Sequence, residues 1–346
     1  MASGLWRLGI VAVVLACAGR AGAQAAGPLP ANLESAIDRG LFFLQKQQKA
    51  DGSFDATGPE HAMAGLALLA FLANGHTPDV GKYGLTVRSA ADYLINLNPE
   101  GGYYGRDGSR MYGHCIVTIA LAELYGMELD AGLRVKVRAA LEKALKVILD
   151  AQAINKERTH SGGWRYEPNS TDSDLSVSAW CTLALRACQN AGLAVPKDRV
   201  DRALQYMLKC FRTKANGFAY QPTEEPSAAM TAAALLNMYL LDANERQEAA
   251  LARKYLLNTP VKDGQEYYYY ALYYTTQAAF QAGEGLWPAV WKNNSDQLMS
   301  QKREDGSWPA KNGEPGGSEK RGRFYSTSMA VLTLSVPMRL LPIYQR

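Results

Sequence analysis

Histidine and cysteine are rare in this sequence, and its net charge is small. Its 346 residues include four histidines and five cysteines, and the formal net charge is +4. So small a charge gives no reason to expect nucleic acid or a charged membrane surface as a partner. A Cys-x-x-Cys pair, a phosphate-binding glycine loop and a serine-nucleophile elbow are also missing, which excludes the common thiol, nucleotide and serine-hydrolase sites.

Apolar stretches of membrane-spanning length are absent, and a shorter one at the N-terminus has flanks of its own kind. Arg7 precedes an apolar stretch at residues 8–18, and the small residues Ala21-Gly22-Ala23 follow it. This order predicts a secretory signal peptide at residues 1–23, and the stretch is too short to span a bilayer. We therefore expect an exported protein, periplasmic or secreted, with one domain at residues 24–346 and no transmembrane helix.

The cysteines do not form a recognisable disulfide framework. Cys17 lies in the leader and only half-resembles a lipoprotein site, so we do not predict a lipid anchor. Cys181 and Cys188 lie on one predicted helix at a separation of about 10 Å, which is farther than a disulfide reaches. Together with Cys115 and Cys210 they are predicted to be small buried apolar residues, and the sequence leaves their disulfide status open.

A short pattern recurs along the chain: an apolar pair, a glutamine, and a turn of glycine followed by an aromatic residue. The clearest copies contain Gln48 with Asp51-Gly52-Ser53-Phe54, and Gln301 with Asp305-Gly306-Ser307-Trp308. Weaker copies end at Gly102-Tyr103, Gly163-Trp164 and Gly217-Phe218. Their spacing of about 45 to 60 residues is typical of arrays of helical hairpins.

Each copy combines an amphipathic helix, the turn, and a second helix that is far more apolar. The apolar helices are predicted at residues 62–73, 112–125, 175–191, 227–241, 267–282 and 325–334. A helix that is apolar on all sides must be surrounded by protein, whereas an amphipathic one can face water. We therefore predict an all-α (α/α)6 toroid of about six hairpins, with the apolar helices as the inner ring and almost no sheet.

The turn has an expected role in this architecture. Its glycine should end the outer helix with a positive φ, and the glutamine should bond the carbonyls left free at that helix end. The aromatic residue should wedge between neighbouring hairpins.

The repeats resemble those of squalene–hopene cyclases, whose helical toroid also occurs in the β-subunits of protein prenyltransferases. More closely, the chain resembles exported bacterial proteins labelled as carrying prenyltransferase and squalene oxidase repeats. The resemblance covers most of residues 33–346 and includes Met111-Tyr112-Gly113-His114, Gly163-Trp164-Arg165-Tyr166 and residues 173–180. It implies a toroid with a central cavity for an apolar, isoprenoid-like molecule, and says little about the reaction.

One segment resembles the acid motif of class II terpene cyclases. Asp172-Ser173-Asp174-Leu175-Ser176 follows their Asp-x-Asp-Asp-Thr pattern, in which the middle aspartic acid protonates an alkene or epoxide. The final aspartate of the motif is missing here. The resemblance implies Asp174 as the acid, with Asp172 as a further catalytic candidate and His114 as a partner. The alternative is that Asp172 or Ser173 caps the helix and Asp174 lies in its first turn.

His114 lies on an otherwise apolar inner helix, on one face with Thr118 and Leu121. It is either a hydrogen-bonded core residue or an acid–base group at the mouth with His61 and Asp174. Protein prenyltransferases hold zinc with Asp, Cys and His, but no Asp-x-Cys pair is present here. We expect no cofactor and keep a zinc site of His61, His114 and Asp174 as an alternative.

Tyrosines cluster at residues 267–274. Tyr267, Tyr270 and Tyr274 share one helical face, and aromatic walls can hold an isoprenoid chain or stabilise a carbocation. The alternative is that these rings serve packing alone. The predicted ligand-binding residues are Tyr112, Trp180, Tyr270, Tyr274 and Tyr325.

Three functions remain open from the sequence. The first is a ligand-binding or terpenoid-type enzyme for an isoprenoid-like or other apolar molecule, with the basic residues at 320–323 either meeting an anionic head or facing solvent. The second is a non-catalytic envelope interaction module, which predicts a mouth filled by side chains and no perturbed acid. The third is a polysaccharide-active enzyme, which needs two carboxylates across a groove, chosen from Glu60, Asp174 and Glu225.

Overall fold

Helices make up nearly all of the regular structure in this computed structural model, which describes residues 29–56, 58–97, 99–283, 285–311, 313–315 and 319–345. The predicted signal peptide and Cys17 lie outside these residues. Strand in the described part is limited to β1 (Phe211–Arg212) and β2 (Gly217–Phe218), which pair antiparallel. None of the described helices is both long and apolar enough to cross a membrane.

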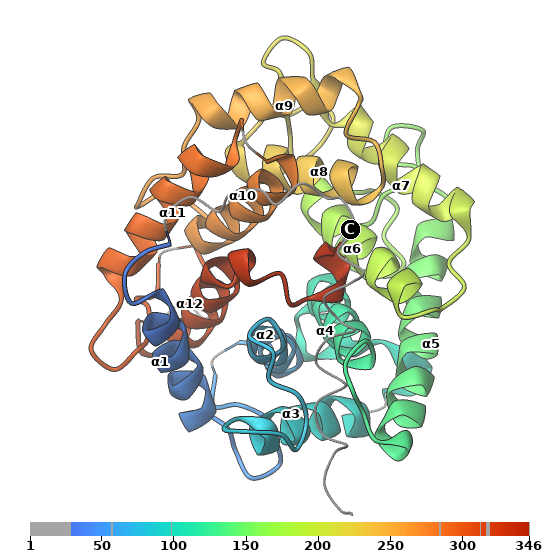
Figure 1. Ribbon diagram of the computed structural model, residues 1–346. Coiled ribbons are helices and arrows are strands. Elements are labelled where there is room, and N and C mark those ends of the chain that lie inside the picture. Colours follow the sequence, from blue (N-terminus) through green and yellow to red (C-terminus); the bar gives the residue numbers. More distant parts are fainter. Residues whose placement is uncertain are drawn as a thin grey trace, which may run out of the picture.

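The helices alternate between an outer and an inner ring (Figure 1). The outer helices are α1 (Leu33–Lys46), α3 (Gly84–Leu97), α5 (Ala131–Ala153), α7 (Lys197–Lys209), α9 (Gln247–Asn258) and α11 (Trp287–Gln301). The inner helices are α2 (Glu60–Leu72), α4 (Arg110–Tyr125), α6 (Leu175–Asn190), α8 (Ala228–Leu240), α10 (Tyr268–Ala282) and α12 (Glu319–Leu334). Each inner helix packs against the next, and α12 packs against α2, so the ring is closed. The predicted α/α toroid is therefore confirmed.

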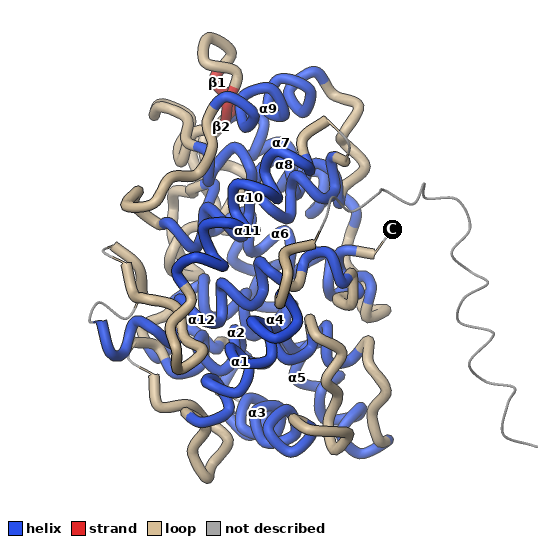
Figure 2. Tube along the Cα trace, turned by 60° about the vertical axis from the view of Figure 1, so that its left-hand side comes forward, coloured by secondary structure: helices blue, strands red, loops and turns tan. Residues whose placement is uncertain are grey.

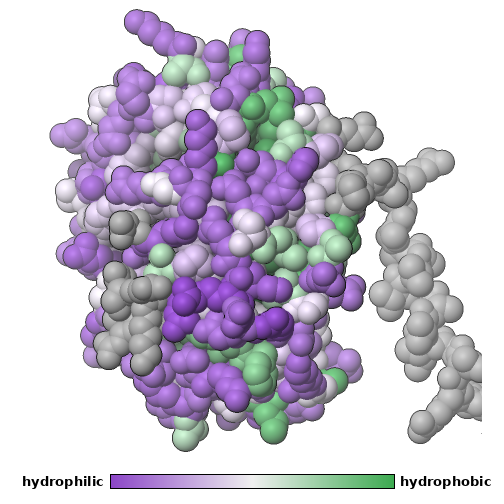
Figure 3. All heavy atoms as spheres, turned by 90° about the vertical axis from the view of Figure 1, so that its left-hand side faces the viewer, coloured by the Kyte–Doolittle hydropathy of each residue, from purple (hydrophilic) through white to green (hydrophobic). Residues whose placement is uncertain are grey.

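Burial separates the two rings in the way that the apolar patterns predict. Every residue of α2 from Ala62 to Leu72 is buried, and so is every residue of α10 from Tyr268 to Phe280. The outer helix α7 buries only Ala203, Tyr206 and Met207. The outer surface seen in Figure 3 is mostly hydrophilic, as expected when amphipathic helices turn their polar faces to water.

The cysteines among the described residues are all buried, as predicted, and none of them forms a disulfide, a point that the sequence left open. Cys115 on α4 and Cys181 on α6 approach each other, with 3.0 Å between their sulfur atoms. The two thiols therefore contribute to the packing between neighbouring inner helices.

Three of the turn glycines seat their hairpin on the outer helix of the next one. A Cβ at Gly52 would overlap the carbonyl oxygen of Ser89 on α3, and at Gly162 it would overlap that of Arg202 on α7. In the last hairpin, a Cβ at Gly306 would overlap the carbonyl oxygen of Arg39 on α1. All three glycines have φ between +86° and +98°, which L residues rarely adopt. The same contact thus recurs between hairpins and also closes the ring.

The turn glutamines reinforce this seating. Gln48 Nε2 donates to the carbonyl of Thr86 on α3 at 2.9 Å, and Gln152 Nε2 donates to that of Arg199 on α7 at 2.9 Å. Gln152 also donates to the carbonyl of Gly162 in its own turn at 2.9 Å. The expectation that these glutamines bond their own helix ends is wrong, because their amides reach the next hairpin instead.

Two aromatic residues of the turns donate hydrogen bonds to carbonyls near the ends of the outer helices. The indole N–H of Trp164 donates to the Ile148 carbonyl of α5, and that of Trp308 donates to the Leu298 carbonyl of α11, both at 2.8 Å. Trp308 also packs against the next hairpin, since a Cβ at Gly40 of α1 would lie 3.0 Å from its ring. The predicted wedge between hairpins is therefore present at the ring closure.

The C-terminal segment crosses the centre of the ring and covers the C-terminal ends of the inner helices (Figure 1). It contains the 3-10 turns η3 (Val336–Met338) and η4 (Pro342–Tyr344). The Ile343 N–H is shared between the two carboxyl oxygens of Glu123, each 3.2 Å away, and the Tyr344 hydroxyl pairs with that of Tyr273 at 2.5 Å. Seen from the side, the C-terminus and the β1–β2 turn lie on opposite sides of the ring (Figure 2).

The ring closure can be tested by adding one methyl group. Gly306→Ala forces a Cβ onto the Arg39 carbonyl at a φ of +86°, so we expect the free energy of unfolding to fall by about 2 to 4 kcal/mol. Gly264→Ala is the matched control, because its φ is +82° but nothing lies within 4 Å of the added atom. The control should lose about 1 kcal/mol. Urea unfolding followed by circular dichroism measures both, and equal losses would contradict a role for the contact.

The buried Glu123 predicts a pH dependence of stability. Burial raises the pKa of this carboxyl to about 8 from 4.5. Its stabilising contribution is therefore complete below pH 4.5 and is lost as pH rises to 8, at about 1.4 kcal/mol per pH unit. The variant Glu123→Gln, which keeps an acceptor for Ile343, should be less sensitive to pH than the parent in guanidinium unfolding between pH 5 and 8. Parallel pH profiles for the two proteins would count against this assignment.

Candidate functional site

The inner helices enclose a cavity of about 960 Å³ in the half of the ring nearer their N-terminal ends. All six contribute to its wall, and the exposed side chains of Glu224, Glu225 and Tyr267 mark its open end. The apolar part of the wall consists of Ala62, Met63 and Leu66 of α2, Ile116 of α4, Trp180 of α6, Ala228 to Met230 of α8, and Met329 of α12. The sequence predicted a cavity here, but it did not identify the methionines.

Polar groups gather on the same wall. The Ser176 hydroxyl of α6 bonds the Tyr270 hydroxyl of α10 at 2.9 Å, although both residues are buried. Tyr112 of α4 and Tyr325 of α12 also line the cavity, and burial raises the pKa of both phenols well above its usual value. These hydroxyls therefore stay protonated and can donate or accept hydrogen bonds across the cavity.

Glu314 is the one carboxyl group of the described wall that is buried. It comes from the loop before α12, and its Oε1 accepts a hydrogen bond from the Tyr269 N–H at 2.6 Å, at the start of α10. Its Oε2 is buried without a hydrogen bond of normal geometry. Burial raises the pKa of Glu314 to about 7, against the opposing effects of the Tyr269 N–H and the Tyr325 hydroxyl. Glu314 was not among the residues predicted for the site, because no helical period extends into its loop.

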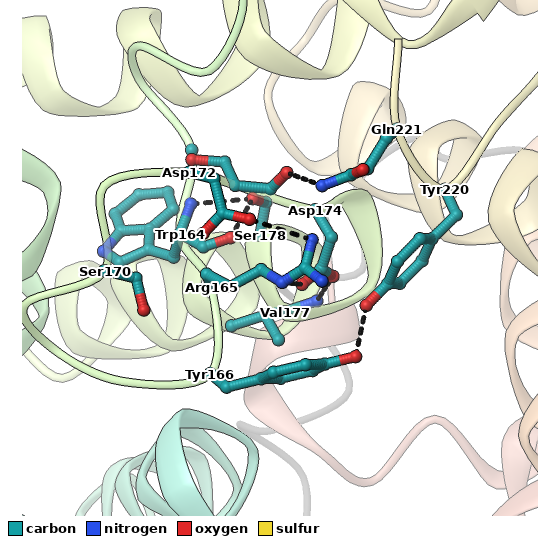
Figure 4. A network of polar contacts seen from close by, with 12 residues as sticks. Trp164, Arg165, Tyr166, Ser170, Asp172, Asp174, Val177, Ser178, Tyr220 and Gln221 are labelled. Atoms are coloured by element: carbon teal, nitrogen blue, oxygen red, sulfur yellow. Dashed lines mark hydrogen bonds and ion pairs between the residues drawn. The ribbon is translucent and has the colours of Figure 1, made fainter. Parts of the chain in front are cut away.

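Asp174 caps α6 from just behind the wall (Figure 4). Its Oδ1 accepts from the Val177 N–H at 2.8 Å, and its Oδ2 lies 3.6 Å from Nε of Arg165. Asp172 is half-exposed and pairs with Nη1 of Arg165 at 3.3 Å. The expectation that Asp172 or Ser173 caps this helix is therefore wrong. Burial raises the pKa of Asp174 to about 7, although the Val177 N–H and Arg165 favour its charged form.

Two tyrosines separate this ion-pair cluster from the cavity. The guanidinium of Arg165 packs on the ring of Tyr166 at 4.8 Å and on that of Tyr220 at 5.5 Å. Their hydroxyls bond each other at 2.5 Å, and both rings line the cavity mouth (Figure 4). Asp174 is fully buried and does not line the cavity, so it can influence a ligand only through groups such as Tyr220.

His114 faces the outer ring and not the cavity. Its Nδ1 accepts from the Tyr104 N–H at 3.3 Å, and its Nε2 lies 3.1 Å from the Ala144 carbonyl of α5, so the ring is a neutral core group with both nitrogens bound. Burial lowers its pKa to about 4. His61 likewise contacts a backbone carbonyl, that of Tyr104, at 2.7 Å.

These positions do not bring the proposed zinc ligands His61, His114 and Asp174 together. Within the described ranges, no group of three or more His, Cys, Asp or Glu side chains is placed to hold a metal ion. His114 and Asp174 also do not pair as acid–base groups, because both ring nitrogens of His114 contact backbone atoms.

Four of the five predicted ligand-binding residues line the cavity: Tyr112, Trp180, Tyr270 and Tyr325. Tyr274 lies behind them, with its ring centre 4.6 Å from that of Tyr270 and 5.6 Å from that of Trp180. Arg323 pairs with Asp305 at 2.7 Å and borders a separate surface pocket. The side chains of the basic residues 320 and 321 lie outside the described part of the chain.

The comparisons with known proteins agree on the fold. No protein-family profile matches the chain, and no curated protein matches it in sequence. Among solved structures, the GH76A α-1,6-mannanase from Salegentibacter sp. HEL1_6 is 11% identical with a TM-score of 0.66, over 89% of this chain and 99% of that one. The type II terpene cyclase MstE from Scytonema is 15% identical with a TM-score of 0.56, over 90% and 99%. At such identities the likeness shows the toroid alone.

The capping role of Asp174 can be separated from its charge. Asp174→Ala removes the acceptor for the Val177 N–H, whereas Asp174→Asn keeps an oxygen in its place. We expect the alanine variant to be less stable than the asparagine variant by about 1 kcal/mol, the usual value of a helix N-cap. Urea unfolding of the two variants at one pH measures the difference. Equal stabilities would show that the side chain does not act as a cap.

Proposed function

We propose that this chain binds an apolar, isoprenoid-like molecule in the central cavity of its toroid, as a protein exported by the predicted leader. The observation that carries the proposal is the composition of the wall. Methionine, leucine, alanine and aromatic side chains from six helices surround a volume near the upper end of the range for small-molecule sites, on the order of 300 to 1,000 Å³.

The arrangement of polar groups supports a ligand with an apolar body and one polar end. The Ser176–Tyr270 pair and the buried carboxyl of Glu314 lie on a wall that is otherwise mainly apolar. Transfer of an apolar chain from water into such a wall is favourable at about 25 cal/mol per Å². A few hydrogen-bonding groups would then fix the orientation of the ligand.

The acid groups favour binding over terpenoid cyclisation. Protonation of an alkene needs a strong acid, but Asp174 and Glu314 both have a pKa of about 7. Asp174 also lies behind the wall, with Arg165 beside it. The incomplete motif, the weak acids and the separation from the cavity argue together against a cyclase of the squalene–hopene type.

Of the two alternatives, the interaction module finds less support, whereas the polysaccharide-active enzyme is as consistent with the structural neighbours as the terpenoid-type protein is. An interaction module predicts a filled mouth and ordinary acids, whereas this cavity is open and two buried carboxyls have raised pKa values. A polysaccharide-active enzyme needs paired carboxylates. Of its three candidates only Glu225 lines the cavity, because Glu60 pairs with Lys49 outside the wall and Asp174 lies behind it. Glu314 could serve as a second carboxylate for Glu225, so the experiment includes an oligosaccharide.

Filling the cavity tests the proposal. Ala228 begins α8 and lines the cavity, so Ala228→Trp should weaken the binding of farnesol by at least about tenfold. Ala131→Trp is the matched control, because Ala131 begins the outer helix α5 and is exposed. Isothermal titration calorimetry measures both, after circular dichroism shows that both variants fold.

Two results would contradict the proposal. The first is unchanged farnesol binding by Ala228→Trp, which would place the ligand elsewhere. The second is a parent protein that binds α-1,6-mannotriose and not farnesol, which would favour the polysaccharide alternative.

A further inference from the structure

The charged residues of the described cavity wall are all acidic. Its described residues include four glutamates, Glu224, Glu225, Glu266 and Glu314, and no lysine, arginine or histidine. The first three are exposed around the opening, so a ligand passes them on the way in. Among the described residues of the wall, a phosphate or diphosphate head would meet only negative charge, at an effective dielectric constant lower than that of water.

The cations next to the mouth whose side chains the structure describes, Arg165 and Arg110, are already paired. Arg165 lies behind the rings of Tyr166 and Tyr220 and is held by Asp172 and Asp174. Arg110, at the start of α4, pairs with Glu167 at 3.2 Å. An anionic head would have to compete with these carboxylates for either guanidinium.

Glu314 has unused binding capacity inside the cavity. Its side chain is only 6% exposed, and Oε2 lacks a hydrogen bond of normal geometry among the described residues, although the Tyr325 hydroxyl lies close enough to favour the charged form of the carboxyl. A buried carboxyl oxygen of this kind is costly unless a donor reaches it. A group that donates hydrogen bonds and carries positive charge would satisfy it best.

The aromatic rings match the same chemistry. Seven of the lining residues are tyrosine or tryptophan, and among them Tyr270 and Tyr325 lie on the helices next to Glu314. Tyrosine and tryptophan faces attract cations, and the attraction grows when the cation is shielded from water. Rings combined with carboxylates are the usual surroundings of a bound ammonium group.

We propose that the apolar ligand carries an amine or ammonium head, which pairs with Glu314 and stacks on the neighbouring tyrosines. The inference rests on the proposed binding of an apolar molecule and adds the chemistry of its head. It separates this chain from prenyl diphosphate sites, which need cations in the wall.

Three ligands that share a farnesyl tail and differ in their polar head group test the proposal. Farnesylamine, farnesol and farnesyl diphosphate are titrated into the full chain by calorimetry, below their critical micelle concentrations. Farnesylamine should bind tighter than farnesol by at least about tenfold, and farnesyl diphosphate should bind most weakly. Glu314→Gln, which keeps an acceptor for the Tyr269 N–H, should bring farnesylamine to within about threefold of farnesol. Glu60→Gln is the control, since Glu60 starts an inner helix outside the wall.

The outcomes are distinguishable. If no farnesyl compound binds, the proposed function itself fails. If farnesol or farnesyl diphosphate binds tightest, apolar binding stands and the amine head is wrong. If the parent prefers the amine and Glu314→Gln keeps that preference, the site of the head is not Glu314. The comparison of heads on the parent does not depend on any variant folding.

Discussion

A close contact between a turn glycine and a carbonyl of the neighbouring outer helix recurs in this fold at Gly52, Gly162 and Gly306. It needs a residue without a Cβ at positive φ, and it occurs between successive hairpins and again where Gly306 meets Arg39. The guanidinium of Arg39 also donates to the Glu304 carbonyl, 265 residues along the chain. The ring is therefore closed by the same packing that joins hairpins within it.

The closed ring places six helix N-termini around one opening. Backbone N–H groups at these ends attract negative charge, which is why Asp174 caps α6 and Glu314 bonds the start of α10. The same burial that protects these caps raises the pKa of both carboxyls. The polar chemistry of the cavity is thus partly a consequence of how its inner helices begin.

The sequence predicted the parts of this structure that depend on periodicity. Wholly apolar helices had to be inside, and aromatic residues near their starts, such as Tyr112 and Trp180, had to face the cavity or a neighbour. The direction of His114 was beyond this reasoning, because an inner helix has a cavity face and an outer face and both are apolar. Glu314 was missed because it reaches the wall from a loop, where no period applies. Asp174 was expected in the first turn of α6, whereas it is the residue that caps this helix.

The C-terminal segment covers the side of the ring opposite the cavity mouth. Its contacts with Glu123 of α4 and Tyr273 of α10 join two inner helices that lie across the ring from each other. The segment therefore acts as a crossbar, which resists any change in the width of the inner ring at that end.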